Sequence, residues 1–398
     1  MRIIGNDPSV PRQEHAVASG TLTDGTAVIV NADGTVSVIS GSSSTQAAGT
    51  KVAISSGNAY QISGRAYDTA NDRVIFVYRD LVNDKAHAVV GTVDGSDNSI
   101  SFGTPVAFST STSVFFPSCA YDTASGKVVI AYQDTGGKAI VGTIDASDNS
   151  ISFGTEVEFA ASITGYTAAF YHPVQECVVI AYEASASKLI AGTVSGTSIS
   201  FGSVATLTGS QMEWPSFAYD SANDKLILSF EGSSNKGYVG VVTVSGTTVT
   251  MNQTVIFNNA VTAYTAAVYD TNAEKFVIFY QDATNSNYGS YVTATVSGTT
   301  VTVSGETVFN SAATYFINAA YHEEANKIFI AYRDNTDSTG KWRFGTVASG
   351  ALATNSITFD TAVQLSSAVP SWFMNAATYD PDQKKIVLGY RDPDNSSR

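Results

Sequence analysis

The stretch "AYDTASGKVVIAYQD", residues 120 to 134, decides the fold of this chain. It has the pattern of a β-hairpin: a strand that ends in Tyr-Asp, a Ser-Gly turn, and an apolar strand that ends in Tyr-Gln-Asp. Nearly the same phrase occurs six more times, at intervals of 48 to 58 residues. Its first tyrosine, the key tyrosine of each repeat, recurs as Tyr67, Tyr121, Tyr171, Tyr219, Tyr269, Tyr321 and Tyr379. A repeat of this period predicts a modular array in which each copy is one supersecondary unit.

Each repeat has room for four strands. The run after the turn, such as "KVVIAY", is apolar at successive positions, which is typical of a strand buried on both faces. A third apolar strand follows, then a short polar turn and a fourth strand that alternates, as in "SISFGTEVEF". Small residues surround the key tyrosine in the first strand, which suits strands that converge on a central axis. Four antiparallel strands in about 50 residues predict the blade of a β-propeller.

The two ends of the chain fix the predicted number of blades. The last repeat stops at "KKIVLGYRDPDNSSR", after two strands, and residues 25–40, "GTAVIVNADGTVSVIS", read as its missing third and fourth strands. Joining both ends in one blade would remove exposed sheet edges. We therefore expect an all-β, seven-bladed propeller of four-stranded blades over residues 19–398, closed by strands from both termini, after an N-terminal arm at residues 1–18.

Composition excludes several partners. The 398-residue chain has a formal net charge of −14, so its field repels nucleic acid and anionic lipid. No apolar stretch reaches the roughly 20 residues of a membrane span, and the first residues lack a secretory signal pattern. The two cysteines, Cys119 and Cys177, are predicted to be buried thiols.

The repeated phrase is predicted to build the fold rather than to carry chemistry. The aspartate after the key tyrosine bonds the amides of the turn that follows, and His172 and His322 replace it in two repeats. The aspartate that closes the second strand, as in Tyr132-Gln133-Asp134, orders the next loop. The acidic turns at residues 94–99 and 145–150 are interpreted as hairpin tips rather than calcium loops.

Enzyme signals are weak. The four histidines show no metal-ligand spacing, and no nucleophile elbow or phosphate-binding glycine loop is present. Propeller glycosidases of the sialidase type carry a Ser-x-Asp-x-Gly-x-Thr-Trp box and several axial arginines; this chain lacks the box, and only Arg65 lies in an innermost strand near its key tyrosine. We therefore expect no enzyme, no catalytic residue, no metal and no cofactor.

A ligand site is predicted on the face formed by the loops that enter the first strand and join the second to the third, because these loops vary in length and content. Every repeat has an aromatic residue five to seven positions before the key tyrosine: Tyr60, Phe116, Tyr166, Trp214, Tyr264, Phe316 and Trp372. Aromatic rings stack on the apolar faces of sugars, and Arg79, Arg333 and Arg391 at the ends of second strands would bond hydroxyls or carboxylates. The alternative is that these rings fill the spaces between blades.

The phrases "KVVIAYQD" and "GTVSGTSISFG", with the opening segment at residues 1–39, resemble bacteriophage proteins, mainly of marine phages, that are described as tail-fibre-like or virion structural proteins. The resemblance covers nearly the whole chain and implies a virion protein at or near the tail, made in the host cytoplasm. The expected function is adhesion to a host surface glycan or protein. Two alternatives are a purely structural tail or capsid component packed against other virion subunits, and a glycan-cleaving propeller. The N-terminal arm is either a frayed terminus or a segment that attaches to other tail proteins.

Overall fold

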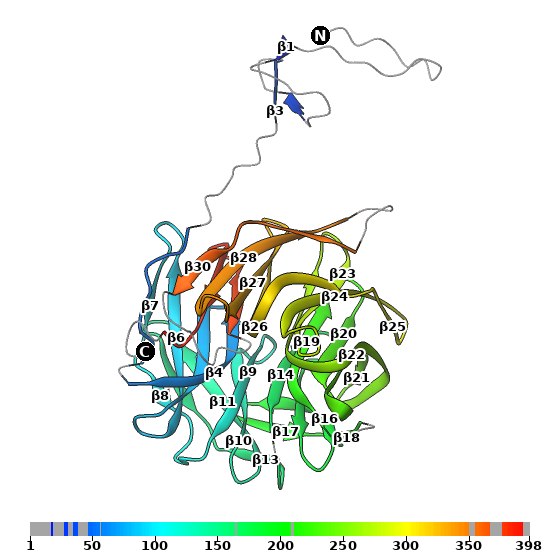
Figure 1. Ribbon diagram of the computed structural model, residues 1–398. Coiled ribbons are helices and arrows are strands. Elements are labelled where there is room, and N and C mark those ends of the chain that lie inside the picture. The colour runs from blue at the N-terminus through cyan, green and yellow to red at the C-terminus, as the bar shows by residue number, and fades with distance from the viewer. Residues whose placement is uncertain are drawn as a thin grey trace, which may run out of the picture. The chain divides into compact units, whose positions relative to one another are not determined.

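The computed structural model describes residues 47–55, 57–163, 165–207, 211–349, 355–366 and 376–392, together with the backbone of residues 17–18, 28–30 and 35–38. The chain divides into two compact units, Met1–Gly49 and Thr50–Arg398. Its regular structure is almost entirely β-strand, as predicted (Figure 1). Within the described residues, no helix is long and apolar enough to span a membrane.

The first unit contains a small sheet of three strands. These are β1 (Val17–Ala18), β2 (Val28–Val30) and β3 (Thr35–Val38). β2 and β3 form the antiparallel hairpin that the sequence predicts, and β1 pairs with β3 in parallel. The predicted boundary after residue 18 differs from the division after Gly49, and residues 1–16 of the predicted arm lie outside the described residues.

The second unit is built on seven hairpins, counted over its described residues; we number their blades 1 to 7 in chain order. The hairpins pair β4 (Ala59–Asp68) with β5 (Arg73–Asp80), β9 (Phe115–Asp122) with β10 (Lys127–Gln133), β14 (Thr167–His172) with β15 (Cys177–Glu183), β19 (Glu213–Asp220) with β20 (Lys225–Glu231), β22 (Thr248–Asp270) with β23 (Lys275–Asp282), β26 (Thr307–His322) with β27 (Lys327–Asp334), and β31 (Ala377–Asp380) with β32 (Lys385–Leu388).

Blades 1 to 6 add a third and a fourth strand to the hairpin. The third strands are β6 (Lys85–Asp94), β11 (Gly137–Asp145), β16 (Ser187–Ser195), β21 (Lys236–Ser245), β24 (Tyr288–Ser297) and β28 (Thr339–Val347). The fourth strand is commonly split into two segments, as in β7 (Ser99–Phe102) with β8 (Val106–Ala107), β12 (Ser150–Phe153) with β13 (Val157–Ala160), β17 (Ser198–Phe201) with β18 (Ala205–Thr206), and β29 (Ile357–Phe359) with β30 (Val363–Ser366). In blades 4 and 5 the long strands β22 and β26 run on from the fourth strand into the innermost strand of the next blade, and β25 (Thr300–Val303) starts the fourth strand of blade 5.

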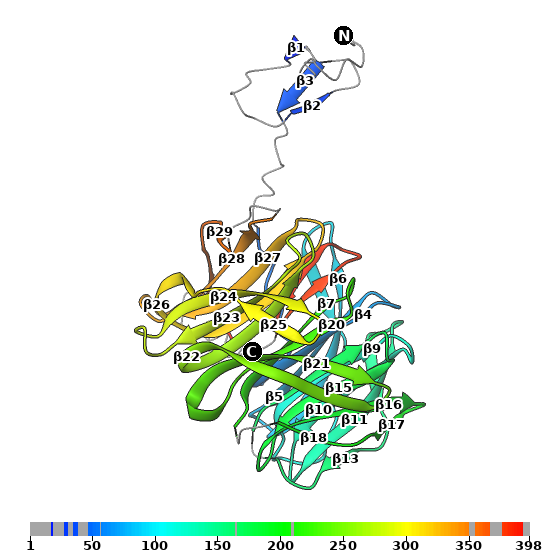
Figure 2. The ribbon, with the colours of Figure 1, turned by 90° about the vertical axis from the view of Figure 1, so that its right-hand side faces the viewer.

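The innermost strands contact one another in a closed ring. β4 contacts β9, which contacts β14, and the series continues through β19, β22, β26 and β31 back to β4. The successive blades pass around the ring in the colour order of Figure 2. The fold is therefore the propeller that the repeat predicts.

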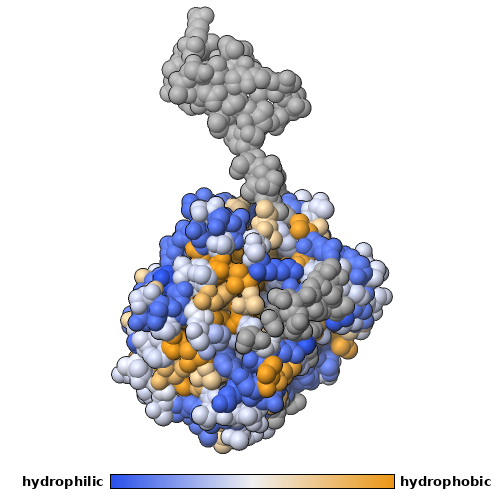
Figure 3. All heavy atoms as spheres, turned by 90° about the vertical axis from the view of Figure 1, so that its left-hand side faces the viewer, coloured by the Kyte–Doolittle hydropathy of each residue, from blue (hydrophilic) through white to orange (hydrophobic). Residues whose placement is uncertain are grey.

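The core lies between the blades. The second strands of blades 1 to 6 are buried on both faces, as the successive apolar residues predict, whereas β32 of blade 7 is half-buried. The buried strands carry the largest fully buried side chains, among them Tyr78, Tyr132, Tyr182, Tyr280 and Tyr332. The outer strands approach each other so closely that a Cβ at Gly154 would lie 1.9 Å from the Thr197 carbonyl oxygen of the next blade. Figure 3 shows small apolar patches among polar residues on one side of the surface.

The pairing across the termini is not the one that the sequence predicts. β31 and β32 pair with each other in a two-stranded sheet, and β2 and β3 belong to the separate sheet with β1. Blade 7 is instead held to blade 1 by side chains. Tyr67 donates its hydroxyl hydrogen to Asp382 at 2.8 Å, Gln383 donates from Nε2 to Asp72 at 2.8 Å, and Arg391 donates from Nε to Asn58 at 3.1 Å.

Candidate functional site

The aspartate after each key tyrosine caps its own turn. Asp122 Oδ1 accepts hydrogen bonds from the amides of Ala124 and Ser125, at 3.0 and 3.1 Å, and the other repeats that carry aspartate show the same pattern. His172 and His322 cap their turns in the same way, because Nδ1 of each ring accepts a hydrogen bond from the backbone amide three positions later. The prediction that this part of the phrase is structural is confirmed.

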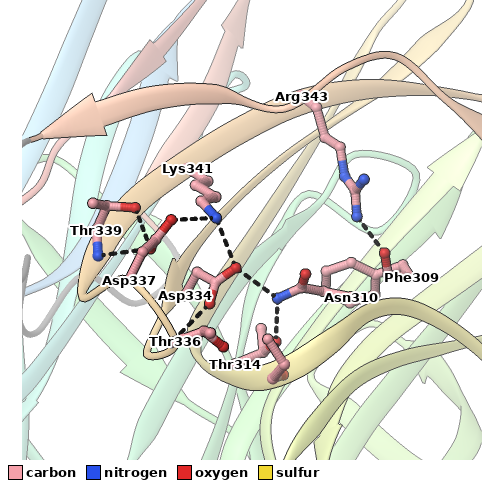
Figure 4. Close-up of polar contacts among 10 residues, drawn as sticks. Phe309, Asn310, Thr314, Asp334, Thr336, Asp337, Thr339, Lys341 and Arg343 are labelled. Atoms are coloured by element: carbon pink, nitrogen blue, oxygen red, sulfur yellow. Dashed lines mark hydrogen bonds and ion pairs between the residues drawn. The ribbon is translucent and has the colours of Figure 1, made fainter.

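The aspartate that closes the second strand orders the following loop (Figure 4). Asp334 accepts the amide of Thr336 at 2.9 Å and pairs with the Lys341 ammonium at 2.8 Å. Asn310 from the preceding strand adds a third contact at 3.4 Å. The loop between β27 and β28 is therefore held by a buried carboxylate at its base.

Five of the predicted aromatic residues form one continuous arc around the axis, although about 50 residues separate each from the next. The ring centroids lie 4.4 Å apart for Phe116–Tyr166, 4.6 Å for Tyr166–Trp214, 4.3 Å for Trp214–Tyr264 and 5.0 Å for Tyr264–Phe316. Phe316 is buried and the other four are half-buried. We call these five side chains the aromatic arc.

An unusual backbone conformation places these rings. Phe116, Trp214, Tyr264 and Phe316 have φ values between 48° and 55°, in the left-handed region that bulky residues rarely adopt. Each lies where the innermost strand shifts register against the second strand, at a β-bulge. Such residues cost about 1–3 kcal/mol each and persist where the surrounding structure requires them. The bulge turns a side chain of the innermost strand toward its neighbours on the axis.

Blades 1 and 7 differ from this pattern. The bulge of blade 1 contains one residue more, and Gln61, with φ 47°, takes the arc position; its Oε1 accepts the Phe116 amide at 3.3 Å. Tyr60 lies one position before the arc, opposite Arg79 on the neighbouring strand. Trp372, the predicted member from blade 7, lies outside the described residues.

A set of polar residues surrounds the arc at the ends of the second strands, one in each blade. In blade order these are Arg79, Gln133, Glu183, Glu231, Gln281, Arg333 and Arg391. The three arginines belong to the adjacent blades 6, 7 and 1, and the two glutamates to blades 3 and 4 across the ring. This face therefore has a positive side and an acidic side.

The three predicted arginines lie against aromatic rings. The guanidinium carbon lies 4.4 Å from the ring centroid of Phe115 for Arg79, 5.4 Å from that of Tyr315 for Arg333, and 5.9 Å from that of Tyr60 for Arg391. Hydrogen bonds fix them further: Arg79 Nη2 donates to Asp84 at 3.0 Å and Arg333 Nη2 donates to Asn335 at 2.7 Å. The arginines are thus held in place beside the arc.

The acidic side contains three glutamates that sequence reasoning missed. Glu213 and Glu231 are paired across β19 and β20, and Glu231 is buried. A Cβ at Gly165 would lie 2.6 Å from Glu183 Oε2, so this carboxyl lies directly over the residue before Tyr166. Burial, with a smaller contribution from Glu213, raises the pKa of Glu183 to about 7 and that of Glu231 to about 8. Both carboxyls therefore take up protons at a higher pH than an ordinary glutamate does.

Other predicted features have simple roles. Cys119 and Cys177 are buried free thiols, as expected. In the acidic turn of blade 1, Asp94 Oδ1 accepts the amide and hydroxyl of Ser96, and Asp145 does the same with Ser147. These contacts cap the turns.

Comparison with known proteins supports the fold and leaves the function open. No protein-family model and no curated protein matches the chain. Among solved structures it is similar to a protein from Lactobacillus plantarum, with a TM-score of 0.51 and 16% identity over 87% of this chain and 94% of that one. It is also similar to the Pseudomonas aeruginosa periplasmic gluconolactonase, with a TM-score of 0.57 and 11% identity over 77% and 86% of the two chains. Saccharomyces cerevisiae Sqt1 matches with a TM-score of 0.51 and 10% identity over 84% and 81%.

The likeness to a gluconolactonase contradicts the prediction that this chain is not an enzyme. That prediction rested on missing local motifs, but a propeller assembles its axial site from residues of several blades, so a short motif is not required. At 11% identity the likeness shows a shared fold and does not carry the lactonase activity over.

Proposed function

We propose that this protein recognises a glycan on a host cell surface, and that the aromatic arc with its flanking arginines and glutamates is the binding face. The observation that carries the proposal is the arc itself. Four of its residues are held in a costly left-handed conformation at the same position of four different blades. Residues held in such conformations cluster at ligand-binding sites.

The chemistry of the face suits a sugar. Half-buried aromatic rings offer apolar surface on which a sugar ring stacks, and the exposed part of the arc spans blades 2 to 5. Arginines bind carboxylates and hydroxyls through several fixed donors. Protonated Glu183 and Glu231 would donate hydrogen bonds to sugar oxygens on the opposite side. An acidic glycan would place its carboxylate toward blades 6, 7 and 1.

The virion role is part of the same proposal and is supported by the resemblance of the sequence to phage tail-fibre-like proteins. The protein would then belong to an extracellular particle, with other tail proteins as partners of its N-terminal segment. Nothing in the comparisons bears on this role. A structural component without ligand would keep the ring of blades and bind no glycan.

A glycan array with the purified chain tests the proposal, because the ligand class is open. The test variant is Trp214→Asn, since asparagine tolerates the left-handed conformation and removes the ring. The control is Trp214→Phe, which keeps a ring of the kind found at Phe116 and Phe316. We expect binding by the wild type and Trp214→Phe, and loss of at least tenfold in affinity in Trp214→Asn with an unchanged fold. A wild-type protein that binds no glycan and no host cell would refute the proposal in favour of a structural role.

Cleavage of the bound glycan is a second candidate, favoured by one observation. A carboxyl that keeps its proton near pH 7 is the group that general acid catalysis requires, and Glu231 has that property beside the arc. A reducing-sugar assay with each glycan found on the array, in wild type and Glu231→Gln, separates the two. Release of sugar by the wild type that is lost in Glu231→Gln would establish cleavage; unchanged glycan with both proteins would establish adhesion alone.

A further inference from the structure

A second site lies inside the ring of innermost strands. A cavity of about 330 Å³ follows the axis, at the small end of the roughly 300–1,000 Å³ that ligand pockets occupy. The residues two positions before the key tyrosines all line it: Arg65, Cys119, Ala169, Phe217, Ala267, Ala319 and Ala377. Four of the seven are alanine. The cavity exists because most of the side chains at these positions are small.

Arg65 is the one charged side chain in this set, and no described residue balances its charge. Its Nε donates to the Ala377 carbonyl oxygen at 2.8 Å, and this is the one hydrogen bond that the described residues give it. No carboxylate among them forms an ion pair with it, and none lines the cavity. Burial lowers the pKa of Arg65. The Cys119 thiol, which lines the same cavity, stays neutral because burial raises the pKa of that thiol to about 12.

An arginine remains charged in a protein, so a half-buried guanidinium with no counter-ion among the described residues is costly. The position does not require it, since alanine serves in four other blades. Two nitrogens of the fork, Nη1 and Nη2, are left for a bidentate partner, which is the geometry that a carboxylate offers. The cavity therefore supplies what a single carboxylate needs.

The opposite wall supplies an apolar surface. Phe170 and Phe217, from blades 3 and 4, line the same cavity and are half-buried, with ring centroids 5.9 Å apart. The half-buried phenol rings of Tyr219 and Tyr379 line the end of the cavity next to the first turns, which brings that end within reach of solvent. A ligand with a charged head and an apolar body fits these walls.

We propose that the axial cavity binds a small organic carboxylate, with the carboxylate on Arg65 and the apolar body against Phe170 and Phe217. This site is separate from the glycan-binding face, since none of the aromatic arc lines it. Its ligand would add the counter-ion that the fold leaves out. The proposal does not depend on the proposed function.

Titration calorimetry of the full chain with sodium benzoate, at constant ionic strength, tests this site. We expect saturable binding of one benzoate per chain and weaker binding of acetate, which lacks the apolar body. Arg65→Ala should weaken benzoate at least tenfold, and its melting temperature reports whether the fold is kept. Lys127→Ala is the matched control, because it removes one positive charge at the first residue of β10, away from the cavity, and should bind benzoate like the wild type.

A second variant keeps the test decisive if Arg65→Ala does not fold. Ala319→Leu leaves Arg65 in place and fills part of the cavity, so it should also lose benzoate. Absence of saturable benzoate binding in the wild type would overturn the proposal, as would equal affinity in folded Arg65→Ala or in Ala319→Leu. Displacement of benzoate by equimolar chloride would overturn the assignment to an organic carboxylate.

Discussion

The rings of Trp214 and Tyr264 lie 4.3 Å apart, centroid to centroid, although they belong to different blades and are 50 residues apart in sequence. Each stands at φ above 50° on a bulge of an innermost strand. The repeat thus places equivalent strained residues side by side around the axis. The proposed glycan-binding face is built on that arrangement.

The strained backbone at Trp214 predicts an inverted preference between alanine and glycine. In the left-handed region alanine destabilises the folded state by about 1–2 kcal/mol, whereas glycine destabilises it by about 0.5–1 kcal/mol through lost chain entropy. Trp214→Gly should therefore be more stable than Trp214→Ala by roughly 0.5–1 kcal/mol in denaturant unfolding. At Trp342, on the regular strand β28, the order should be the usual one, with alanine more stable. The same order at both sites would argue against the bulge conformation.

The pKa values on the acidic side predict a pH dependence of stability. A carboxyl whose pKa rises on folding from 4.5 to about 8 binds more protons in the folded state than in the unfolded one, so stability falls as pH rises through that window. Glu231→Gln mimics the protonated form. It should match the wild type near pH 4.5 and exceed it at pH 8 by on the order of 1–3 kcal/mol in the free energy of unfolding.

The equivalent position of blade 5 offers the reverse experiment. Gln281 is buried there, and its Nε2 donates to the Thr314 carbonyl oxygen of blade 6. Gln281→Glu should lose stability progressively between pH 5 and pH 8. A stability difference between Glu231→Gln and the wild type that does not change with pH would show that Glu231 is not held protonated.

The closure of the ring predicts different results for two truncations. All seven hairpins lie in residues 50–398, so a chain without residues 1–49 should keep the melting temperature of the propeller. Removal of residues 377–398 deletes β31, which contacts both β26 and β4, and should open the ring and expose strand edges. We expect aggregation or a loss of more than about 10 °C, by scanning fluorimetry and size-exclusion chromatography. If removal of residues 1–49 destabilised the propeller and removal of residues 377–398 did not, the closure by strands of both termini that the sequence predicts would be supported instead.

The Tyr67–Asp382 bond allows a finer test of the same seam. Tyr67→Phe removes the hydroxyl that lies 2.8 Å from Asp382 and 2.9 Å from Asp72. It should cost about 0.5–1.5 kcal/mol, the usual net value of one hydrogen bond, and it keeps the ring packing. Val82→Ala is a suitable control, since that side chain on the same blade is 73% exposed and should change little. Equal stability of all three proteins would show that the Tyr67 hydroxyl does not stabilise this seam.

The repeat made most of the fold predictable, because a fixed period and two-sided apolar strands leave few alternatives. The repeat also predicted that Phe116, Tyr166, Trp214, Tyr264 and Phe316 lie together. Each of them is five positions before its key tyrosine, which places them at the same height along the propeller axis. The repeat misplaced Tyr60, because blade 1 has an extra residue in its bulge that no pattern marks.

Two other features could not be predicted from the sequence. The alternating pattern of residues 28–38 predicts a hairpin but does not name its neighbour, and so the terminal pairing was wrong. Glu183 and Glu231 stand at the same position of their blades as the three arginines, and the repeat does not distinguish them as site residues. Their raised pKa depends on burial, which a linear sequence does not display.

The most direct test is to observe Trp214 while glycan binds. The chain has three tryptophans, and the buried Trp342 of blade 6 serves as an internal control. In NMR spectra of the indole N–H groups, assigned with Trp214→Phe and Trp342→Phe, the best glycan from the array is titrated into the full chain. The account predicts a saturable shift of the Trp214 resonance, with the affinity measured for binding, and a fixed Trp342 resonance. Saturable binding that leaves the Trp214 resonance unmoved would contradict it.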